Sequence, residues 1–246
     1  MKPFTYLLIN FFTVFVCFLF SFHPKIRFYK HFDAFIKAVL LASILFISWD
    51  IWFTKVGVWW FNTNYTLGLS ILNLPMEEWM FFICIPFSCV FTYFCFTKFF
   101  DLKWADKYSK QIVILVTVLC SVVILLNYNR LYPLVTATVT AGFLLYLFFV
   151  AGVNWIGSAT LVYLVLMLGF FPVNGILTGS GLESPIVNYN PEQILNIRMF
   201  TIPVEDAFFG YSQFLLNVYF FLLFKKSEEK TSDQTYVKSK ITTAYE

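Results

Sequence analysis

The chain has 246 residues, of which 59% are hydrophobic and 13% are charged, and its formal net charge is +3. This composition excludes an ordinary soluble domain and predicts a protein with several membrane-spanning helices. The five cysteines fall in apolar runs without metal-ligand spacing, and the two histidines share one basic loop. The sequence therefore predicts neither a disulfide framework nor a metal site.

Seven apolar runs are each close to the ~20 residues that cross the hydrocarbon core as a helix. They cover about residues 4–22, 35–53, 79–97, 111–127, 132–150, 155–173 and 207–224. A signal peptide is the alternative for the first run, but Phe20-Ser21-Phe22-His23-Pro24 offers no small-residue cleavage site, which favours a retained anchor. We therefore expect an all-α integral membrane fold with seven transmembrane helices.

Lysine and arginine predict how the chain is oriented, because cytoplasmic loops carry an excess of both. All but four of the 17 Lys and Arg residues lie in three segments: the loop after the first span with the foot of the second, the loop after the third span, and the tail. The four others are Lys2, Lys55, Arg130 and Arg198. With seven spans, this asymmetry predicts an N-terminus outside and a C-terminus in the cytoplasm, in the inner (cytoplasmic) membrane of the cell.

Three connecting segments differ in character. Residues 54–78 contain Trp59, Trp60, Phe61 and Tyr65, and these aromatic side chains indicate a belt at the membrane interface. Residues 174–206 form the longest connection, and a loop of this length is usually functional or mobile. Residues 225–246 form a polar tail, which we expect to be poorly ordered.

One acidic motif occurs twice. Pro75-Met76-Glu77-Glu78 opens the third predicted span, and Pro203-Val204-Glu205-Asp206 opens the seventh, 128 positions later. Both spans run from outside to inside, so spans one to three and five to seven predict two like-oriented three-helix repeats. Span four joins them as a linking helix, as in transporters built from repeats. The predicted units are residues 1–97, the linking segment 98–131, and residues 132–224, followed by the tail.

Weaker echoes precede each motif. Asn64-Tyr65 and Ile71-Leu72-Asn73 resemble Asn188-Tyr189 and Ile194-Leu195-Asn196. Their spacing to the proline differs between the copies, which predicts an insertion in the second. Because ligand sites in such folds form between the halves, we expect all four motif acids to meet in one cavity.

The motif acids have a structural and a functional interpretation. Proline at the first helical position and acids in the first turn are ordinary helix-opening residues. Capping needs only one acid, however, and intramembrane acids are functional by default. We therefore take Glu77, Glu78, Glu205 and Asp206 as the candidate catalytic residues. Consecutive helical residues point about 100° apart, so one acid of each pair is expected to face the cavity. Such a cluster can hold a proton donor beside a proton acceptor.

Further polar and aromatic residues are candidates for supporting roles. Asp50 is predicted either to contact the motif acids or to anchor the second span at the interface. Arg198 either pairs with one of the acids of the second motif or is a plain interfacial arginine. Asn174 supplies either a hydrogen bond or turn chemistry. Four phenylalanines are packing candidates whose ring faces would stabilise a nearby carbocation, and they are Phe81, Phe82, Phe208 and Phe209.

At these residues the sequence resembles the heterodimer-type lycopene cyclases of bacteria, archaea and fungi. The resemblance rests on Pro75-Met76-Glu77-Glu78-Trp79-Met80-Phe81-Phe82, on Thr201-Ile202-Pro203-Val204-Glu205-Asp206 and on Asn174-Gly175-Ile176-Leu177-Thr178-Gly179. It covers most of residues 1–224, with the two halves fused in one chain.

The resemblance implies a lycopene β-cyclase, an isomerase of the intramolecular lyase type. An acid would protonate the terminal double bond of linear lycopene, a neighbouring double bond would close the ring, and a base would remove a proton. The implied partners are the carotenoid substrate and the lipid bilayer, with no nucleic acid and no cofactor. The implied catalytic positions are the four motif acids, and the choice of donor and base stays open. Ala207 stands where the first motif has Trp79, so the two halves are not equivalent.

Three other functions compete with this one. An acyclic carotenoid hydratase, or another end-group enzyme, would form the same cation and quench it with water. A small proton-coupled transporter would also use a repeat and intramembrane acids. A retinal-binding protein is disfavoured, because the seventh span has no lysine for a Schiff base. The residues do not decide between one and two cyclised ends, or the oligomeric state.

Overall fold

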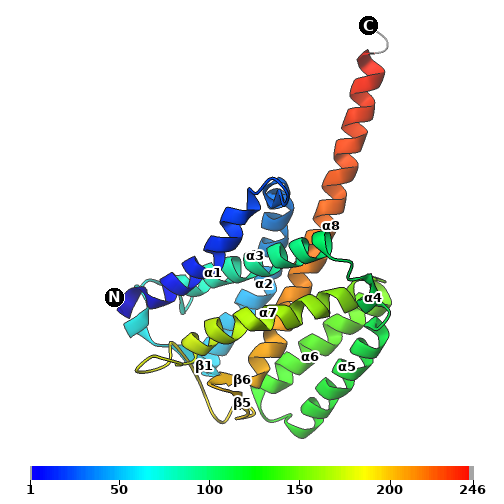
Figure 1. The fold of residues 1–246 in the computed structure, drawn as a ribbon. Helices are drawn as coiled ribbons and strands as arrows, with labels where there is room; N and C mark the ends of the chain where they lie inside the picture. Colours follow the sequence, from blue (N-terminus) through cyan, green and yellow to red (C-terminus); the bar gives the residue numbers. More distant parts are fainter. Residues whose placement is uncertain (1, 244–246) are drawn as a thin grey trace.

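The computed structural model describes residues 2–243, with side chains up to residue 228. It confirms the predicted all-α fold with seven helices long and apolar enough to cross a membrane (Figure 1). The long helices are α1 (Thr5–Ser21), α2 (Phe32–Val56), α3 (Met76–Phe99), α5 (Ser109–Leu126), α6 (Leu131–Leu145), α7 (Ile156–Leu177) and α8 (Val204–Thr243). Short helical turns are η1 (Lys2–Phe4), η2 (Phe28–His31), η3 (Thr63–Tyr65), α4 (Lys103–Asp106) and η4 (Tyr146–Val150), which continues α6.

Helices α7 and α8 extend furthest beyond the predicted C-terminal ends of their spans. Helix α7 continues to Leu177 and includes Asn174, which the sequence placed in a loop. It does so although Pro172 lies inside it, because the bilayer-facing backbone keeps its other helical hydrogen bonds. The backbone of α8 continues to Thr243, past the predicted end at residue 224. Residues 244–246 and the side chains from residue 229 lie outside the described residues, so the predicted polar tail stays a prediction.

Six short strands, which the sequence did not predict, lie in the two long loops. They are β1 (Trp59–Phe61), β2 (Ser70–Ile71), β3 (Leu74–Pro75), β4 (Val187–Tyr189), β5 (Arg198–Met199) and β6 (Ile202–Pro203). The labelled ones gather at the end of the bundle where α8 begins (Figure 1). Each of β2–β3 and β5–β6 is a tight hairpin that leads straight into the helix carrying an acidic motif.

The strands show that the two halves are related by a pseudo-two-fold axis. Strands β1 and β4 are 128 positions apart and pair with each other antiparallel, with Trp60 opposite Asn188 at the centre. The hairpin register is also repeated at 128 positions, since Ser70 pairs with Pro75 and Arg198 pairs with Pro203. Left-handed backbone conformations recur at the same offset, at Gly68 and Asn196. The predicted repeat is thus a geometric relationship between the halves.

This relationship corrects the echoes found in the sequence. At an offset of 128, Leu67 and Gly68 correspond to Leu195 and Asn196, so Ile71-Leu72-Asn73 is not the counterpart of Ile194-Leu195-Asn196. The spacing from β1 to the first motif equals the spacing from β4 to the second, so no insertion lies between them. The predicted insertion was wrong, because matches between short hydrophobic segments determine an alignment less reliably than the register of the hairpins does.

Packing between the halves follows the pseudo-two-fold axis. Helix α2 of the first half packs against α8 of the second, and α7 of the second half packs against α3 of the first. The linking helix α5 lies at the edge of the bundle against α6 (Figure 1). The first turns of α3 and α8, which carry the motif acids, are therefore held at the same end of the bundle, between the two halves.

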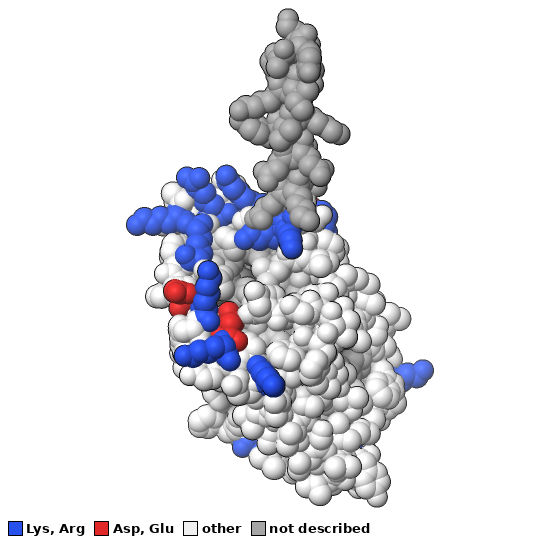
Figure 2. Space-filling model, turned by 90° about the vertical axis from the view of Figure 1, so that its right-hand side faces the viewer, with Lys and Arg blue, Asp and Glu red and all other residues white. Residues whose placement is uncertain are grey.

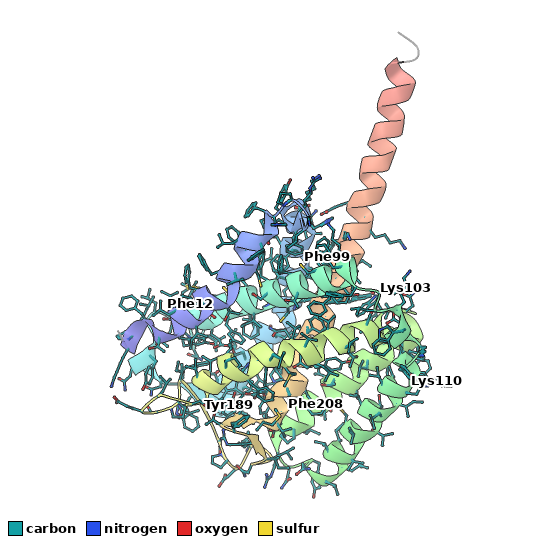
Figure 3. The ribbon with its side chains drawn as sticks, in the orientation of Figure 1. Phe12, Phe99, Lys103, Lys110, Tyr189 and Phe208 are labelled. Atoms are coloured by element: carbon teal, nitrogen blue, oxygen red, sulfur yellow. The ribbon has the colours of Figure 1, made fainter. Side chains whose placement is uncertain are left out.

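Basic residues collect at the opposite end. Figure 2 shows many Lys and Arg side chains toward the upper end of the face in view, above a broad surface with few charged side chains. In Figure 3, Lys103 and Lys110 lie away from Tyr189 and Phe208, which mark the end with the strands. The acidic motifs and the basic loops thus occupy different ends of the molecule.

Candidate active site

A cavity of about 90 Å³ lies beside the first turns of α3 and α8. Its polar lining includes two amides, Asn174 and Gln213, besides three carboxyl groups and three tyrosines, namely Asp50, Glu78, Asp206, Tyr6, Tyr132 and Tyr189. Its aromatic walls are Trp59, Phe61, Phe81, Phe82, Phe170 and Phe209. The cavity therefore brings acids from both halves together in an aromatic enclosure.

The structure divides each acidic pair between two tasks. Oε1 of Glu77 accepts a hydrogen bond of 2.6 Å from the backbone N–H of Leu67, and Oε1 of Glu205 accepts one of 2.6 Å from Leu195. Both acceptors lie ten positions after their donors, at the pseudo-symmetric positions. These two acids hold the hairpin loops and do not line the cavity. Their neighbours in the chain, Glu78 and Asp206, do line it.

Glu78 has a tyrosine and a second carboxyl group as neighbours. The buried Tyr6 hydroxyl on α1 donates a hydrogen bond to Oε2 of Glu78. The carboxyl group of Asp50 on α2 lies close enough to Glu78 to interact with it directly. Trp59 Nε1 donates to Oδ1 of Asp50 at 2.5 Å, whereas Oδ2 of Asp50 is buried without a partner in the described residues. Two adjacent carboxyl groups in an apolar site are more stable with one proton between them than with none.

Asp206 has two tyrosine donors instead. Tyr132 on α6 donates to Oδ1 at 2.6 Å, and Tyr189 at the end of β4 donates to Oδ2 at 2.8 Å. Burial, followed by the charge of Asp206, raises the pKa of Tyr189 well above its ordinary value, so this hydroxyl keeps its proton. Donors on both oxygens are the environment that favours an ionised carboxylate.

The two halves thus share one arrangement and differ in one partner. Tyr6 and Tyr132, each on the first helix of its half, donate to the second acid of the motif. By the offset of 128, Asp50 corresponds to Thr178, which lies just past the end of α7 and hydrogen-bonds Thr201 at 2.7 Å. Because this position is a threonine, the second half has no carboxyl group that corresponds to Asp50.

The aromatic candidates divide in a similar way. Phe81, Phe82 and Phe209 line the cavity, whereas Phe208 points to a separate apolar pocket that also borders Glu205. Trp59 was predicted in an interfacial belt but is only 6% exposed, while its neighbour Trp60 is 48% exposed. The buried indole of Trp59 donates to Asp50.

The other supporting candidates are close to the site. Asn174 lines the cavity from α7 and is part of a helix, not of a turn. Arg198 forms no ion pair with Glu205 or Asp206 in the described residues. Its guanidinium donates to the carbonyl of Thr201 at 2.5 Å and lies 5.9 Å from the centre of the Tyr189 ring. Tyr189, over which Arg198 lies, donates in turn to Asp206.

Sequence reasoning missed the three tyrosines. Tyr6 and Tyr132 lie near the starts of the first and fifth spans, 126 positions apart, and an alignment of the two predicted repeats could have paired them. Tyr189 stands next to Asn188 in an echo that the sequence already showed, but its counterpart at 128 positions is Phe61. No sequence signal distinguishes Tyr189 from a loop tyrosine.

The comparisons with known proteins agree with the repeat. A family model described as lycopene cyclase matches residues 3–96 and 129–224. The two matched segments correspond to the two halves and leave out α5, and Tyr6 and Tyr132 are each the fourth residue of their segment. No curated protein and no solved structure matches the chain.

Proposed function

We propose that this chain, which belongs to the lycopene cyclase family of membrane enzymes, closes a β-ionone ring at the end of linear lycopene. The observation that carries the proposal is the pair of tyrosine-bonded acids, Glu78 and Asp206, which come from opposite halves and line one aromatic cavity. A redox-neutral cyclisation needs one group that lends a proton and one that removes a proton, both within reach of a single end group.

The first step is protonation of the terminal double bond. We assign the donor to the Asp50–Glu78 pair, because both carboxyl groups are buried and line the cavity, and neighbouring carboxyl groups in an apolar site favour the retention of one proton. Glu78 delivers the proton, and Asp50 is the neighbouring group that keeps it available. The tertiary cation formed by this step lies among the ring faces of Phe81, Phe82 and Phe209, which stabilise positive charge.

The second step closes the ring and returns a proton. A neighbouring double bond attacks the cation, forms the ring bond and leaves a new cation on the ring. We assign the base to Asp206, because Tyr132 and Tyr189 donate to both of its oxygens and so favour the carboxylate. Loss of a ring proton to Asp206 gives the β-double bond. The proton gained equals the proton lost, so the reaction is an isomerisation.

The orientation in the membrane is part of the proposal. Many Lys and Arg side chains gather at the end of the bundle opposite the strands (Figure 2), and an end rich in Lys and Arg faces the cytoplasm. The acids then lie near the outer face of the inner membrane, with the N-terminus outside. Glu77 and Glu205 belong to the site as loop-holding residues, and Arg198 and Asn174 as groups at its border.

The test is pigment analysis after expression in a bacterial host that accumulates lycopene. The expected products are carotenoids with β-ionone rings, identified by absorbance and mass spectrometry. A hydroxylated acyclic product without rings would show a hydratase. Uptake or export of unchanged lycopene would show a transporter, and either result would overturn the proposal.

A further inference from the structure

A second cavity, of about 330 Å³, adjoins the acidic one. The two cavities share lining residues from α3, α7 and α8: Ile85, Phe170, Asn174, Gly210 and Gln213. The two cavities therefore adjoin each other, with these residues between them. The acids line the first cavity, and the second extends from there between the helices of the two halves.

The outer end of the second cavity reaches the side of the bundle. Gly169 and Pro172 of α7 line the second cavity and are both exposed, and Thr13 of α1 lines it from across the gap. A Cβ added at Gly169 would meet no atom within 4 Å, so the absence of a side chain keeps this position open. Pro172 leaves the carbonyl of Leu168 without its helical hydrogen-bond donor, which weakens the helix at this mouth.

The mouth lies at the depth of the hydrocarbon core. Gly169 is 13 residues after the start of α7 and eight residues before its end. At 1.5 Å per residue, it is at least about 12 Å from either end of the helix. Figure 1 shows α3 and α7 side by side with α1 beyond α3, and all three are membrane spans. The opening therefore faces lipid tails.

The lining of the second cavity suits a hydrocarbon. Pro86, Leu166, Val173 and Phe214 supply apolar surface, and Gly210 allows the close approach of Tyr163, whose hydroxyl would lie 2.9 Å from a Cβ there. A hydrocarbon chain in the bilayer is already in an apolar environment. It gains free energy by entering the cavity only if it packs closely against the lining. An extended, narrow polyene meets that condition.

We propose that the second cavity is the lateral entrance and holding site for the polyene chain of the substrate. The end group passes Gly169 and reaches Glu78 and Asp206, the adjoining isoprene units lie between α3, α7 and α8, and the remainder of the chain stays in the bilayer. This inference rests on the proposed function. It makes Gly169 a specificity-determining position, since the size of its side chain sets the width of the entrance.

The test compares Gly169→Phe with Gly142→Phe. Gly142 is also an exposed helical glycine with no atom within 4 Å of an added Cβ, but it lies on α6 away from the cavity. Both changes favour helix formation, so neither is expected to unfold the protein. Gly169→Phe should lower ring formation by at least about tenfold, which corresponds to about 1.4 kcal/mol. Gly169→Ala should have a smaller effect, and Gly142→Phe none.

A binding measurement separates this inference from the proposed reaction. In an Asp206→Asn background, lycopene that co-purifies with the protein is measured by absorbance. Gly169→Phe should lower the bound lycopene about tenfold, while Gly142→Phe leaves it unchanged. Unchanged lycopene binding in Gly169→Phe would overturn the proposal that the second cavity is the substrate entrance. Loss of co-purified phospholipid, with lycopene binding unchanged, would also overturn it and would identify a binding site for lipid acyl chains. Full ring formation by the Asp206→Asn variant itself would instead overturn the base assignment.

Discussion

The Tyr132 hydroxyl donates a hydrogen bond of 2.6 Å to Asp206, joining the first helix of the second half to the third. Tyr6 and Glu78 make the same connection in the first half. In each case the tyrosine selects the second acid of the motif, and the first acid binds a loop amide. The motif therefore has one acid that lines the cavity and one that binds the loop.

The first prediction compares Asp206→Asn with Glu205→Gln. Removing a general base costs about 10²–10⁴-fold in rate, and we expect that loss of ring formation for Asp206→Asn. In Glu205→Gln the amide oxygen still accepts the Leu195 N–H, so the loss should stay within about tenfold. Initial rates in membranes, normalised to protein amount, measure both. A larger loss in Glu205→Gln than in Asp206→Asn would reverse the division of tasks.

The second prediction distinguishes the proton donor from the base by their products. Without Glu78 as donor, the cation never forms, so Glu78→Gln should accumulate unreacted lycopene. Without Asp206 as base, the cation can form but is not deprotonated, so Asp206→Asn should yield traces of water-quenched, hydroxylated carotenoid. Mass spectrometry of the pigments measures both outcomes. The opposite pattern, with hydroxylated pigment only from Glu78→Gln, would exchange the two roles.

The third prediction concerns the proton itself. If Glu78 exchanges its proton with water before each turnover, a reaction in deuterated water should place one deuterium atom in each ring formed. The expected mass increase is one unit per ring, because the proton that Asp206 removes comes from a different carbon. Rings without deuterium would contradict protonation by an exchangeable acid.

The sequence predicted the seven spans, the repeat and the two acidic motifs, because composition and periodicity determine these features directly. It did not separate Glu77 from Glu78 or Glu205 from Asp206. That separation depends on which residue of a helical pair faces the hairpin amide, and the hairpins themselves were not predicted. Two-residue strands leave no alternating pattern in a sequence.

The same reason explains the residues that were missed. Tyr189 reaches Asp206 from a loop, and its position depends on the pairing of β4 with β1, a contact between segments 128 positions apart. Asn174 was assigned to a loop because Gly and Pro neighbours usually end helices. In the structure, Pro172 and Asn174 instead lie within α7 and line the second cavity.

The fourth prediction tests Tyr189. Tyr189→Phe removes one of the two donors to Asp206 and leaves a buried carboxylate oxygen unsatisfied, at a cost of about 1–3 kcal/mol. Ring formation should fall by about tenfold or more, with little change in lycopene bound. Tyr146→Phe is the matched control, because Tyr146 pairs with Tyr219 at 3.3 Å on the exposed surface, away from the cavity. An equal effect of both variants would mean that Tyr189 acts only through packing.

The last prediction concerns stability at the other end of the bundle. Gly157, at the start of α7, lies against α4, and an added Cβ would be 2.1 Å from the carbonyl oxygen of Ala105. The start of α7 cannot move away easily, because the backbone N–H of Gly157 donates to Ser109 at 3.0 Å and that of Ser158 donates to Asp106 at 2.7 Å. Gly157→Ala should therefore destabilise the protein by about 1–3 kcal/mol, the usual range for overpacking. Gly142→Ala, in open space on α6, should be neutral or stabilising by up to about 1 kcal/mol. Thermal unfolding in detergent measures both, and equal melting temperatures would show that α4 does not fix the start of α7.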